Sequence, residues 1–564
     1  MKKLFTLLTL TLLCKIMTPQ SSNWVKNLGD TTANTIGEYI TTDALGNVYT
    51  TGYFIGTVDF DPSPSTFTLA STSLYADVFI SKLDAFGNFL WAKIIKGTDF
   101  SYSNSIAADS IGNIYITGEF QGIVDFDPNS GIQQYSSTST DIFILKLDAM
   151  GNFNWVKTIG DASTDSGRSI TLDKFANVYI AGNFSGTIDF DSSSGVSNLT
   201  SNSGTFILKL ESNGNFVWVK GMLGTTIYPR CIKLDKTGNI YTTGTFYGAV
   251  DFDPSTSNHD SLNSNIGGSI FVSKLDNSGN YIWAKNMGDP GQIYETGYSI
   301  AIDHLGCVYC IGRFAGTGDF DPNIGSYFLT TIGIQDMFIS KLDVNGNFMW
   351  AKSIGNIGYS TFGFSIELNN FGDIYATGSF ENTTDFDPGN SIFTLTSAGS
   401  LNAYLLKLTS TGNFVSVTPF NSTGISEGRS LTINHSDNIY MTGVYNATAN
   451  FDINGENTTL TSSSISVNTY ILKQSLNIIG INEILEDNKT LNIFPNPNNG
   501  EFNIVSKERM ILTVVNNLGQ TIQTIQLNEA NGYQQNINVN TSGLYYINGV
   551  TVQSSIKQKV IVTE

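Results

Sequence analysis

At 564 residues the chain is longer than one hydrophobic core usually grows, which predicts several domains or a modular array. Charged residues make up only 14% and glycines number 55, a composition typical of many turns between short strands rather than of long helices. The formal charge of -19 argues against nucleic acid as a partner, because an acidic surface repels phosphate backbones.

The N-terminus has the pattern of a secretory leader. Two lysines precede an apolar run, Leu4–Leu13, and polar residues follow it. Because this run is too short to span a bilayer, we predict a signal peptide at residues 1–21, and no later stretch is apolar enough to predict a transmembrane segment. Cys14 lies in the leader, so the chain has too few cysteines left for a disulfide framework.

One unit of about 65 residues recurs seven times between residues 22 and 477. Its clearest marker is a Phe-Asp pair, usually within Asp-Phe-Asp-Pro, and successive copies lie 66, 64, 62, 68, 66 and 65 residues apart. The marker aspartates are Asp61, Asp127, Asp191, Asp253, Asp321, Asp387 and Asp452. Such a period indicates an array in which each copy packs on its neighbours.

Each copy contains four strand-like segments. In the second copy these are Ser105–Asp109, Ile114–Phe126 with a bend at Gly122, Ile142–Leu147 and Phe153–Thr158. Asp-x-x-Gly-Asn joins the first strand to the second and the third to the fourth, which is typical of a hairpin whose Asp accepts turn amides and whose Gly takes a positive φ. Four antiparallel strands per repeat predict the blades of a propeller.

The fourth strand of a repeat is marked by aromatic-x-Trp-x-Lys. The marker occurs around Trp91, Trp155, Trp218, Trp283 and Trp350, with Ser416 in place of the sixth tryptophan. The seventh repeat lacks this strand, whereas an orphan copy, Trp24-Val25-Lys26, precedes the first repeat. We therefore predict an all-β fold in which a seven-bladed β-propeller is closed by its N-terminal strand, since closure removes the exposed edges.

The repeats resemble a known family. Their forms are Gly-Asn-Ile-Tyr-x-Thr-Gly-x-Phe, Asp-Phe-Asp-Pro, Phe-Ile-x-Lys-Leu-Asp and Gly-Asn-Phe-x-Trp-x-Lys, which are similar to the SBBP family of bacterial β-propeller repeats. The resemblance covers residues 22–477. It implies an architecture and no particular reaction, because propellers host unrelated functions.

The repeat markers stop near residue 477, and we predict a linker at residues 478–490. Residues 491–564 alternate apolar positions between turn signals, which predicts a small Ig-like β-sandwich. Its ordered motif residues are Pro495, Asn496, Pro497, Gly500, Gly519, Gly543, Tyr545, Lys557 and Lys559.

These motifs, at the end of a chain that begins with a leader, resemble the C-terminal sorting domain of the bacterial type IX secretion system. The resemblance implies export through the periplasm and recognition of this domain by the type IX machinery. It also implies a final location that is secreted or on the outer cell surface.

Three acidic loops place oxygen-bearing side chains at alternate positions. They are Asp125-x-Asp127-x-Asn129, Asp189-x-Asp191-x-Ser193 and Asp319-x-Asp321-x-Asn323. Because Ca²⁺ prefers oxygen ligands at such spacing, these loops are candidate calcium sites. The alternative is structural: the aspartates cap the turn after the second strand, and no acidic residue stands at the twelfth position of the loop. Both interpretations stay open.

No catalytic motif lies in the context that its chemistry needs. The string Gly424–Gly428 matches a nucleophile elbow around Ser426, but it joins two blades of an all-β array instead of a strand and a helix. Cys307 and Cys310 would project from opposite faces of a strand, which predicts free buried thiols. Seven lysines in equivalent positions, beginning with Lys82, could ring one surface or could each extend to solvent or pair with an Asp.

We expect a secreted or cell-surface binding, adhesion or scaffolding module, and not an enzyme. A surface protein or a glycan would bind at one mouth of the ring, where loops gather on a rigid support. One alternative is an extracellular polysaccharide hydrolase or lyase, for which Glu119, Glu295, Glu367 and Glu381 are the acids that break the repeats. Another is a structural spacer. A concave cluster of acids would favour the enzyme, and an exposed aromatic patch would favour binding.

Overall fold

The computed structural model describes the repeats and most of the C-terminal strands. The described residues are 23–29, 33–71, 75–255, 257–288, 291, 295–453, 456–475, 491–496, 500–506, 510–516, 521–528, 531–539, 543–550 and 555–562. The predicted signal peptide and linker lie outside them. The described residues form strands and no α-helix, so none of them belongs to a helix that could cross a membrane.

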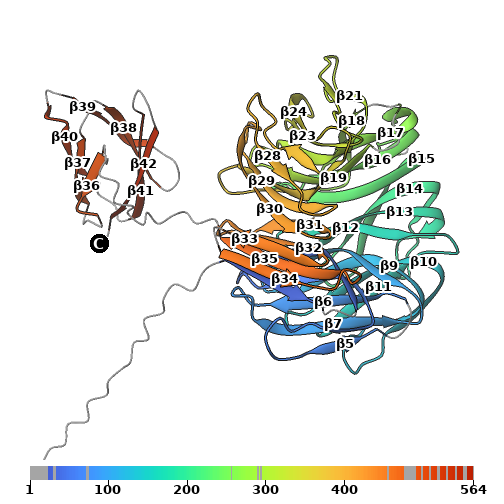
Figure 1. The fold of residues 1–564 in the computed structure, drawn as a ribbon. Helices are drawn as coiled ribbons and strands as arrows, with labels where there is room; N and C mark the ends of the chain where they lie inside the picture. The colour runs from blue at the N-terminus through green and yellow to red at the C-terminus, as the bar shows by residue number, and fades with distance from the viewer. Residues whose placement is uncertain are drawn as a thin grey trace, which may run out of the picture. The chain divides into compact units, whose positions relative to one another are not determined.

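The chain divides into two compact parts, Met1–Leu476 and Asn477–Glu564, which we call the repeat body and the C-terminal body. Within the described residues of the repeat body, strand pairing gives one antiparallel meander of four strands for each sequence repeat (Figure 1).

Repeats 1 to 3 occupy the first half of the repeat body. Repeat 1 contains β2 (Asn34–Thr42), β3 (Val48–Ile55), β6 (Asp77–Leu83) and β7 (Phe89–Gly97), with a side hairpin of β4 (Thr57–Asp59) and β5 (Thr68–Ala70). Repeat 2 contains β8 (Ser101–Ala108), β9 (Ile114–Asp125), β10 (Gln134–Leu147) and β11 (Phe153–Ile159). Repeat 3 contains β12 (Ser166–Leu172), β13 (Val178–Asp189), β14 (Asn198–Leu210) and the first part of β15 (Phe216–Leu234).

Repeats 4 to 6 continue the array. Repeat 4 contains the rest of β15, β16 (Ile240–Asp251), β17 (Ser261–Leu275) and β18 (Tyr281–Met287). Repeat 5 contains β19 (Thr296–Ile302), β20 (Val308–Phe314), β23 (Asp336–Leu342) and β24 (Phe348–Ile354), with β21 (Thr317–Asp319) and β22 (Phe328–Thr330) as its side hairpin. Repeat 6 contains β25 (Thr361–Leu368), β26 (Ile374–Phe380), β29 (Asn402–Leu408) and β30 (Phe414–Ser422), with β27 (Thr383–Asp385) and β28 (Thr394–Thr396).

Repeat 7 takes its fourth strand from the other end of the repeat body. Its own strands are β31 (Ser426–Ile433), β32 (Asn438–Tyr445) and β35 (Asn468–Ser475), with β33 (Thr448–Ile453) and β34 (Glu456–Thr461) as the side hairpin. The N-terminal strand β1 (Trp24–Leu28) pairs antiparallel with β35, with Trp24 opposite Lys473. The predicted pairing of the Trp24 strand with the last repeat is confirmed. In Figure 1 the orange strands of repeat 7 lie beside the blue strands of repeat 1.

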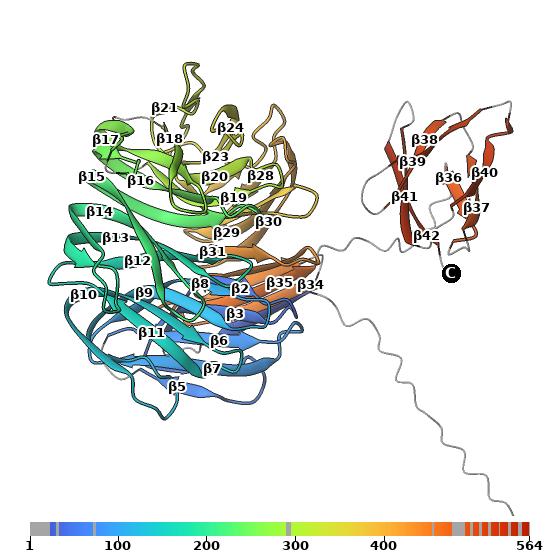
Figure 2. The ribbon, with the colours of Figure 1, turned by 180° about the vertical axis from the view of Figure 1, so that it is seen from behind.

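The first strands of the repeats contact one another in sequence. β2 contacts β8, and the series continues through β12, β15, β19, β25 and β31, which in turn contacts β2. In Figure 2 several of these strands lie toward the middle of the repeat body.

The predicted hairpin chemistry is present. In repeat 2, Asp109 Oδ1 accepts the amides of Ile111 and Asn113, and Gly112 has a φ of +88°. The long second strand bends at Gly122, where φ is +74°, as predicted. Past this bend the second and third strands continue as a hairpin, so β10 begins at Gln134 rather than at the predicted Ile142.

At four junctions between repeats, a lysine and a tryptophan of one repeat donate to the same carbonyl of the next. Lys82 Nζ and Trp91 Nε1 both donate to the carbonyl of Ala149 in repeat 2, at 2.8 and 3.3 Å. Each of the seven equivalent lysines lies over a tyrosine ring of its own repeat; for Lys82 the ring is Tyr49, at 4.8 Å. These lysines therefore lie on the neighbouring strand's tyrosine, and four of them are buried instead of forming a cationic ring on one surface. Lys341 and Lys407 pair with Asp303 and Asp373, as the other alternative predicted.

The seam between repeats 7 and 1 uses the same contacts. Lys473 Nζ and Trp24 Nε1 both donate to the carbonyl of Ala85, at 2.9 and 3.3 Å. One hydrophobic cluster spans the seam and includes Leu28, Phe54 and Ile471, all fully buried. The seam is thus built like the junctions that follow repeats 1, 2 and 4, although its strands come from opposite ends of the repeat body.

The C-terminal body contains two antiparallel sheets. The first has β36 (Leu491–Phe494), β37 (Glu501–Ser506) and β40 (Gln534–Asn538), and the second has β38 (Met510–Asn516), β39 (Thr521–Leu527), β41 (Gly543–Val550) and β42 (Ser555–Val562). One core contains residues of both sheets, among them Phe502 and Ile537 from the first and Leu512 and Ile547 from the second.

We predict that Trp24→Ala destabilises the repeat body by about as much as Trp155→Ala, the same position in repeat 2. Each indole donates one hydrogen bond to the next repeat and packs edge-on against a tyrosine, and truncating a partly buried tryptophan costs roughly 2–4 kcal/mol. Urea unfolding followed by tryptophan fluorescence measures both variants. An unchanged midpoint for Trp24→Ala beside a lowered one for Trp155→Ala would contradict the docked strand.

Candidate functional site

Every first strand of the repeat body carries a β-bulge at the same place. In β2 the pairing with β3 jumps from Gly37 to Tyr39 and leaves Glu38 without an opposite residue. The equivalent register shift occurs in all seven first strands. A bulge re-aims the side chain of its extra residue, and bulges are common beside functional sites.

The extra residues share a position five residues before the hairpin Asp or Asn, but not a residue type. We call them the bulge residues: Glu38, Asn104, Arg168, Arg230, Tyr298, Phe364 and Arg429. The residues just after them are more uniform, with serine in five of the seven repeats.

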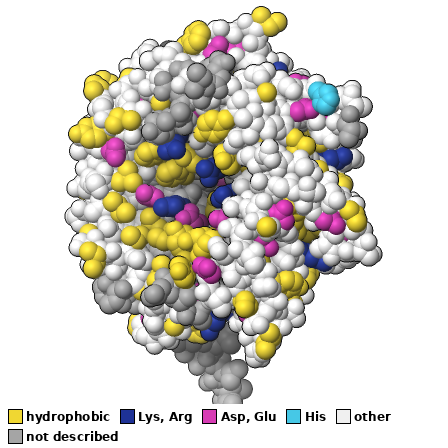
Figure 3. Space-filling model, turned by 90° about the vertical axis from the view of Figure 1, so that its right-hand side faces the viewer, with side chains coloured by type: hydrophobic (Ala, Val, Ile, Leu, Met, Phe, Trp, Pro, Cys, Tyr) yellow, Lys and Arg dark blue, Asp and Glu magenta, His cyan; other side chains and the backbone are white. Residues whose placement is uncertain are grey.

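Five of the seven bulge residues line a central cavity of about 520 Å³, to which all seven first strands contribute residues. An adjoining cavity of about 270 Å³ is lined by Asn104 and Arg168 and shares Glu38 and Arg230 with the first. In Figure 3, basic, acidic and hydrophobic side chains gather toward the middle of the face shown. A concave site of this volume is typical of small-ligand sites.

Arg429 joins two acids at this cavity. Its guanidinium lies 2.9 Å from Glu38 Oε1 and 2.8 Å from Glu427 Oε2. Burial raises the pKa of Glu38 above its usual range, although the Arg429 charge lowers it. Arg429 thereby keeps two partly buried carboxylates together across the junction of repeats 7 and 1.

Two further ion pairs cross between repeats. Lys233 of repeat 4 lies 2.6 Å from Glu367 of repeat 6, and both line the central cavity. Arg168 of repeat 3 lies 3.8 Å from Glu119 of repeat 2. The Lys233–Glu367 pair links two repeats that are not adjacent along the chain, so it spans part of the cavity.

The rings of Tyr298 and Phe364 form another part of the cavity wall. Tyr298 packs edge-on against Phe364 at 5.3 Å between ring centroids, and Phe364 stacks on Phe362 at 5.8 Å. The guanidinium groups of Arg230 and Arg313 lie over the Tyr298 ring, at 5.9 and 5.6 Å. All three rings are half-buried and so present part of their surface to solvent.

The four glutamates singled out from the sequence divide into two pairs. Glu119 and Glu367 belong to the ion pairs around the cavities. Glu295 and Glu381 do not line them; Glu295 is buried, and Glu381 Oε2 accepts the amide of Ser360. The sequence did not point to Glu38 or Glu427, whose partner Arg429 comes almost 400 residues after Glu38.

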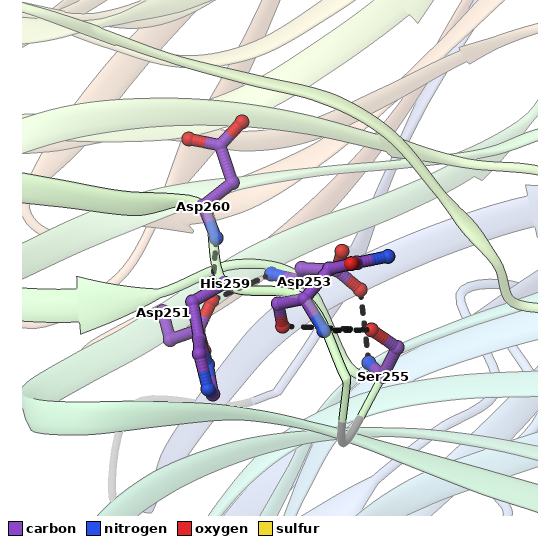
Figure 4. Close-up of polar contacts among 6 residues, drawn as sticks. Asp251, Asp253, Ser255, His259 and Asp260 are labelled. Carbon is purple, nitrogen blue, oxygen red and sulfur yellow. Dashed lines mark hydrogen bonds and ion pairs between the residues drawn. The ribbon is translucent and has the colours of Figure 1, made fainter.

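The acidic loops lie on the side hairpins, outside the residues that line the central cavity. In repeat 4, Asp251 Oδ1 accepts the amides of Asp253 and Asp260, and Asp253 Oδ1 accepts the amide of Ser255 (Figure 4). The imidazole of His259 contacts the other Asp251 oxygen at 2.5 Å.

The three candidate calcium loops repeat these contacts. Asp125, Asp189 and Asp319 each accept two amides through Oδ1, and Asp127, Asp191 and Asp321 each accept one, from Asn129, Ser193 and Asn323 respectively. The aspartates therefore do cap turns. No group of three or more His, Cys, Asp or Glu that could hold a metal occurs among the described residues. Calcium binding stays a prediction.

Other sequence candidates have structural partners. Ser426 Oγ is buried and donates to the carbonyl of Phe420 at 2.6 Å. Cys307 and Cys310 are free and buried, as predicted.

The described motif residues of the C-terminal body lie in and between its strands. Tyr545 is buried in the core, and Gly543 begins β41. Gly500 has a φ of +104°, and a Cβ there would lie 2.6 Å from the Val539 carbonyl, so only glycine fits. Pro495 and Asn496 follow β36, Lys557 and Lys559 lie on β42 opposite Asn548 and Tyr546, and Pro497 and Gly519 lie outside the described residues.

Comparison with known families matches two regions of the chain. Residues 492–563 match the family described as "Secretion system C-terminal sorting domain". The chain carries a C-terminal sorting domain. Residues 154–183, which run from β11 to β13, match the family described as "Beta-propeller repeat", the SBBP family. The sorting domain indicates export through the type IX secretion system to the cell surface or the medium.

Two individual proteins are also similar. An "Uncharacterized WD repeat-containing protein L264" of Acanthamoeba polyphaga mimivirus is 25% identical over 76% of this chain, which covers 36% of that protein's length. A crystal structure of a protein of unknown function from Bacteroides caccae is 11% identical, with a TM-score of 0.31, over 60% of this chain and 89% of that one. A likeness this low carries no structural argument.

We predict that Arg429→Gln destabilises the repeat body mainly at neutral pH. Without the guanidinium, Glu38 and Glu427 lose their shared partner and the already raised pKa of Glu38 rises further. A raised folded-state pKa of an acid gives stability that is present at low pH and lost as pH rises. We expect a loss of about 1.5–3 kcal/mol near pH 7.5 that shrinks toward pH 4.5, measured by urea unfolding. A loss of equal size at both pH values would contradict the pairing.

Calcium binding by the acidic loops would raise the melting temperature. A ligand that binds only the folded state stabilises it by about 2.7 kcal/mol at a hundred times its Kd. Thermal melts in calcium and in chelator, on the wild type and on a variant with Asp127, Asp191 and Asp321 changed to Asn, test this. Identical melting curves for the wild type in both conditions would remove the calcium hypothesis.

Proposed function

We propose that the repeat body is a closed seven-bladed β-propeller and that the protein is an exported binding module, whose ligand is a glycan or a surface protein that enters the central cavity. The β1–β35 pairing and the return contact between β31 and β2 support closure. The two sheets of the sorting domain around one core support an Ig-like sandwich.

The observation that carries the binding role is the variety of the bulge residues. Seven equivalent positions hold one acid, one amide, three arginines and two aromatic residues, while the hairpins and junctions around them repeat. A purely structural position would keep one residue type, as the lysine equivalent to Lys82 does in all seven repeats. The variation turns a symmetric scaffold into an asymmetric, concave site that combines charged side chains with aromatic ones, and concave sites with convergent polar groups are where ligands usually bind.

The exported location agrees with this role. A chain that reaches the cell surface or the medium meets glycans and surface proteins there, and a rigid ring holds a site without a conformational change on binding. The half-buried rings of Tyr298 and Phe364 provide flat apolar surfaces of the kind on which sugar rings or apolar side chains pack.

We predict that Tyr298→Ala and Phe364→Ala each weaken ligand binding about tenfold, because each removes a stacking surface worth roughly 1.4 kcal/mol. The full chain is screened on glycan and surface-protein arrays, and the best ligand is titrated against both variants. Ile324→Ala, a fully exposed position on the acidic loop of repeat 5, is the control. Equal affinities of the wild type and both cavity variants would contradict a ligand site in the cavity.

A second candidate function is cleavage of a polysaccharide, by hydrolysis or by the elimination that a lyase catalyses. It is favoured by two acids, Glu38 and Glu427, at one arginine in the cavity, and by the raised pKa of Glu38, which suits a general acid. If the protein cleaves polysaccharide, Glu38→Gln should lower turnover at least 100-fold, whereas Glu211→Gln in an exposed hairpin should not. An absence of turnover on a polysaccharide panel, with binding intact, would contradict the enzymatic function and leave binding as the proposed function.

A further inference from the structure

The junction between repeats 2 and 3 buries an acid that is not paired with a cation. Asp165 stands directly before β12, is fully buried, and donates its amide to the carbonyl of Thr140 on β10, at 2.8 Å. Its carboxylate accepts the amides of Ser185 on β13, at 2.9 Å, and of Asp161, at 3.3 Å. Among the described residues, no lysine or arginine lies within ion-pair distance of this carboxylate.

Two more aspartates belong to this junction. Asp141 follows Thr140 on β10, and Thr140 is bridged to Thr164, the residue before Asp165. The Oδ1 atom of Asp141 is buried and receives no hydrogen bond from the described residues. Asp161, in the connection between β11 and β12, contributes the amide that Asp165 Oδ2 accepts. Three carboxyl groups from two neighbouring repeats therefore share one junction.

The backbone contact of Asp165 recurs at four other junctions, but the paired acids do not. There too, the residue three positions before the bulge residue donates its amide to the carbonyl of the residue before the Asp141 position, at 2.8–3.0 Å. These residues are Thr35, Ser101, Thr361 and Ser426, and the residues in the place of Asp141 are Asn468, Asp77, Asp336 and Asn402. A neutral hydroxyl residue thus stands where repeat 3 has Asp165, and none of these four junctions has an acid at both positions.

These surroundings make it costly for Asp165 to ionise. Burial, together with the charges of Asp161 and Asp141, raises the pKa of Asp165 to about 7, although the amides of Ser185 and Asp161 lower it. Burial also raises the pKa of Asp141, and the Asp161 charge adds to that effect. In an unfolded chain the pKa of an aspartate is about 3.9. Because the folded-state pKa of Asp165 is raised, the stability it gives is fully present below about pH 4 and is lost as the pH rises to about 7.

The same junction holds two bulge residues in place. Asn104 of repeat 2 donates from Nδ2 to the two residues that follow Asp165, at 3.2 and 3.0 Å. Arg168, the next residue on β12, lies 3.8 Å from Glu119 on β9 of repeat 2. Asn104 and Arg168 both line the cavity of about 270 Å³. A separation of β12 from repeat 2 would therefore displace part of the wall of that cavity.

We propose that the junction between repeats 2 and 3 is pH-sensitive: it is closed while Asp165 is protonated, and it opens more often once this proton is lost to solvent. In the closed state Asp165 is neutral and two carboxylates remain, whereas its ionised form adds a third negative charge to a buried place without a paired cation. This inference is independent of the proposed binding function, because it concerns how two repeats are held together.

Hydrogen–deuterium exchange of the full chain between pH 4.5 and pH 8.5, corrected for the intrinsic exchange rate, tests the proposal. We expect the protection of the β12 amides to fall about tenfold for each pH unit up to about pH 7 and then to level off, because opening releases Asp165 to solvent, where it ionises. Residues 227–234 of β15, the first strand of repeat 4, are the internal control, because Ile227 takes the place of Asp165 there. Their protection should not follow this curve.

Two variants assign the effect to Asp165. Asp165→Asn carries no charge at any pH, and Asp165→Ser supplies the hydroxyl group that other junctions have, so each should keep the protection of β12 nearly constant from pH 4.5 to pH 8.5. Asp336→Asn, which removes the acid at the junction of repeats 5 and 6, is the matched control and should leave the curve of β12 unchanged. Melting curves at pH 5 show that the variants are folded.

Three outcomes would overturn the proposal. One is protection of β12 that does not change with pH in the wild type. Another is an equal change in residues 227–234, which would indicate a general effect of pH on the repeat body. The third is a pH dependence of β12 that survives in both Asp165 variants, which would assign the proton to another group.

Discussion

The pairing of β1 with β35 is the constraint on which the rest of the repeat body depends. These strands come from opposite ends of the repeats, so their hydrogen bonds fix the last repeat beside the first. The Ala85 carbonyl, which accepts both Lys473 and Trp24, repeats the contact found at the Ala149 carbonyl between repeats 1 and 2. Only if this seam holds do seven first strands surround one cavity, and the bulge residues of distant repeats meet only there. Arg429 and Glu38 meet across this seam.

The bulge explains how a uniform array acquires a specific site. In a regular strand of a meander, side chains alternate between the two faces of the sheet, and both faces pack on neighbouring repeats. A regular first strand would therefore direct few side chains toward the cavity. One extra residue per first strand breaks that alternation and frees one side chain for the cavity. Its identity can then vary without disturbing the packing of the repeat. In this chain the outcome is an arginine-rich and aromatic wall on a protein that is acidic overall.

The sequence predicted the strand arrangement of the repeat body better than it predicted the residues at the cavity. The Phe-Asp period, the Asp-x-x-Gly-Asn hairpins and the orphan Trp24 strand each have a local cause, so the four-stranded meanders and the β1–β35 pairing could be expected. The bulge residues could not, because a register shift depends on how two strands pair and leaves no mark in a single strand's pattern. A signal did exist: five residues before each hairpin Asp or Asn, copies that otherwise agree carry five different residue types. The acidic loops could be found from the sequence because they repeat, and the amides that Asp125 accepts show that this aspartate caps its turn.

Hydrogen–deuterium exchange of the full chain tests the central claim most directly, because it reports the backbone hydrogen bonds of β1 without altering the protein. Closure predicts that the amides of β1 exchange as slowly as those of β11 and β18, the fourth strands of repeats 2 and 4, since local opening at the seam would then cost as much as at any other outer strand. Exchange of β1 at the rate of an unstructured peptide, with β11 and β18 protected, would show that the ring is open and that no common cavity joins the seven repeats.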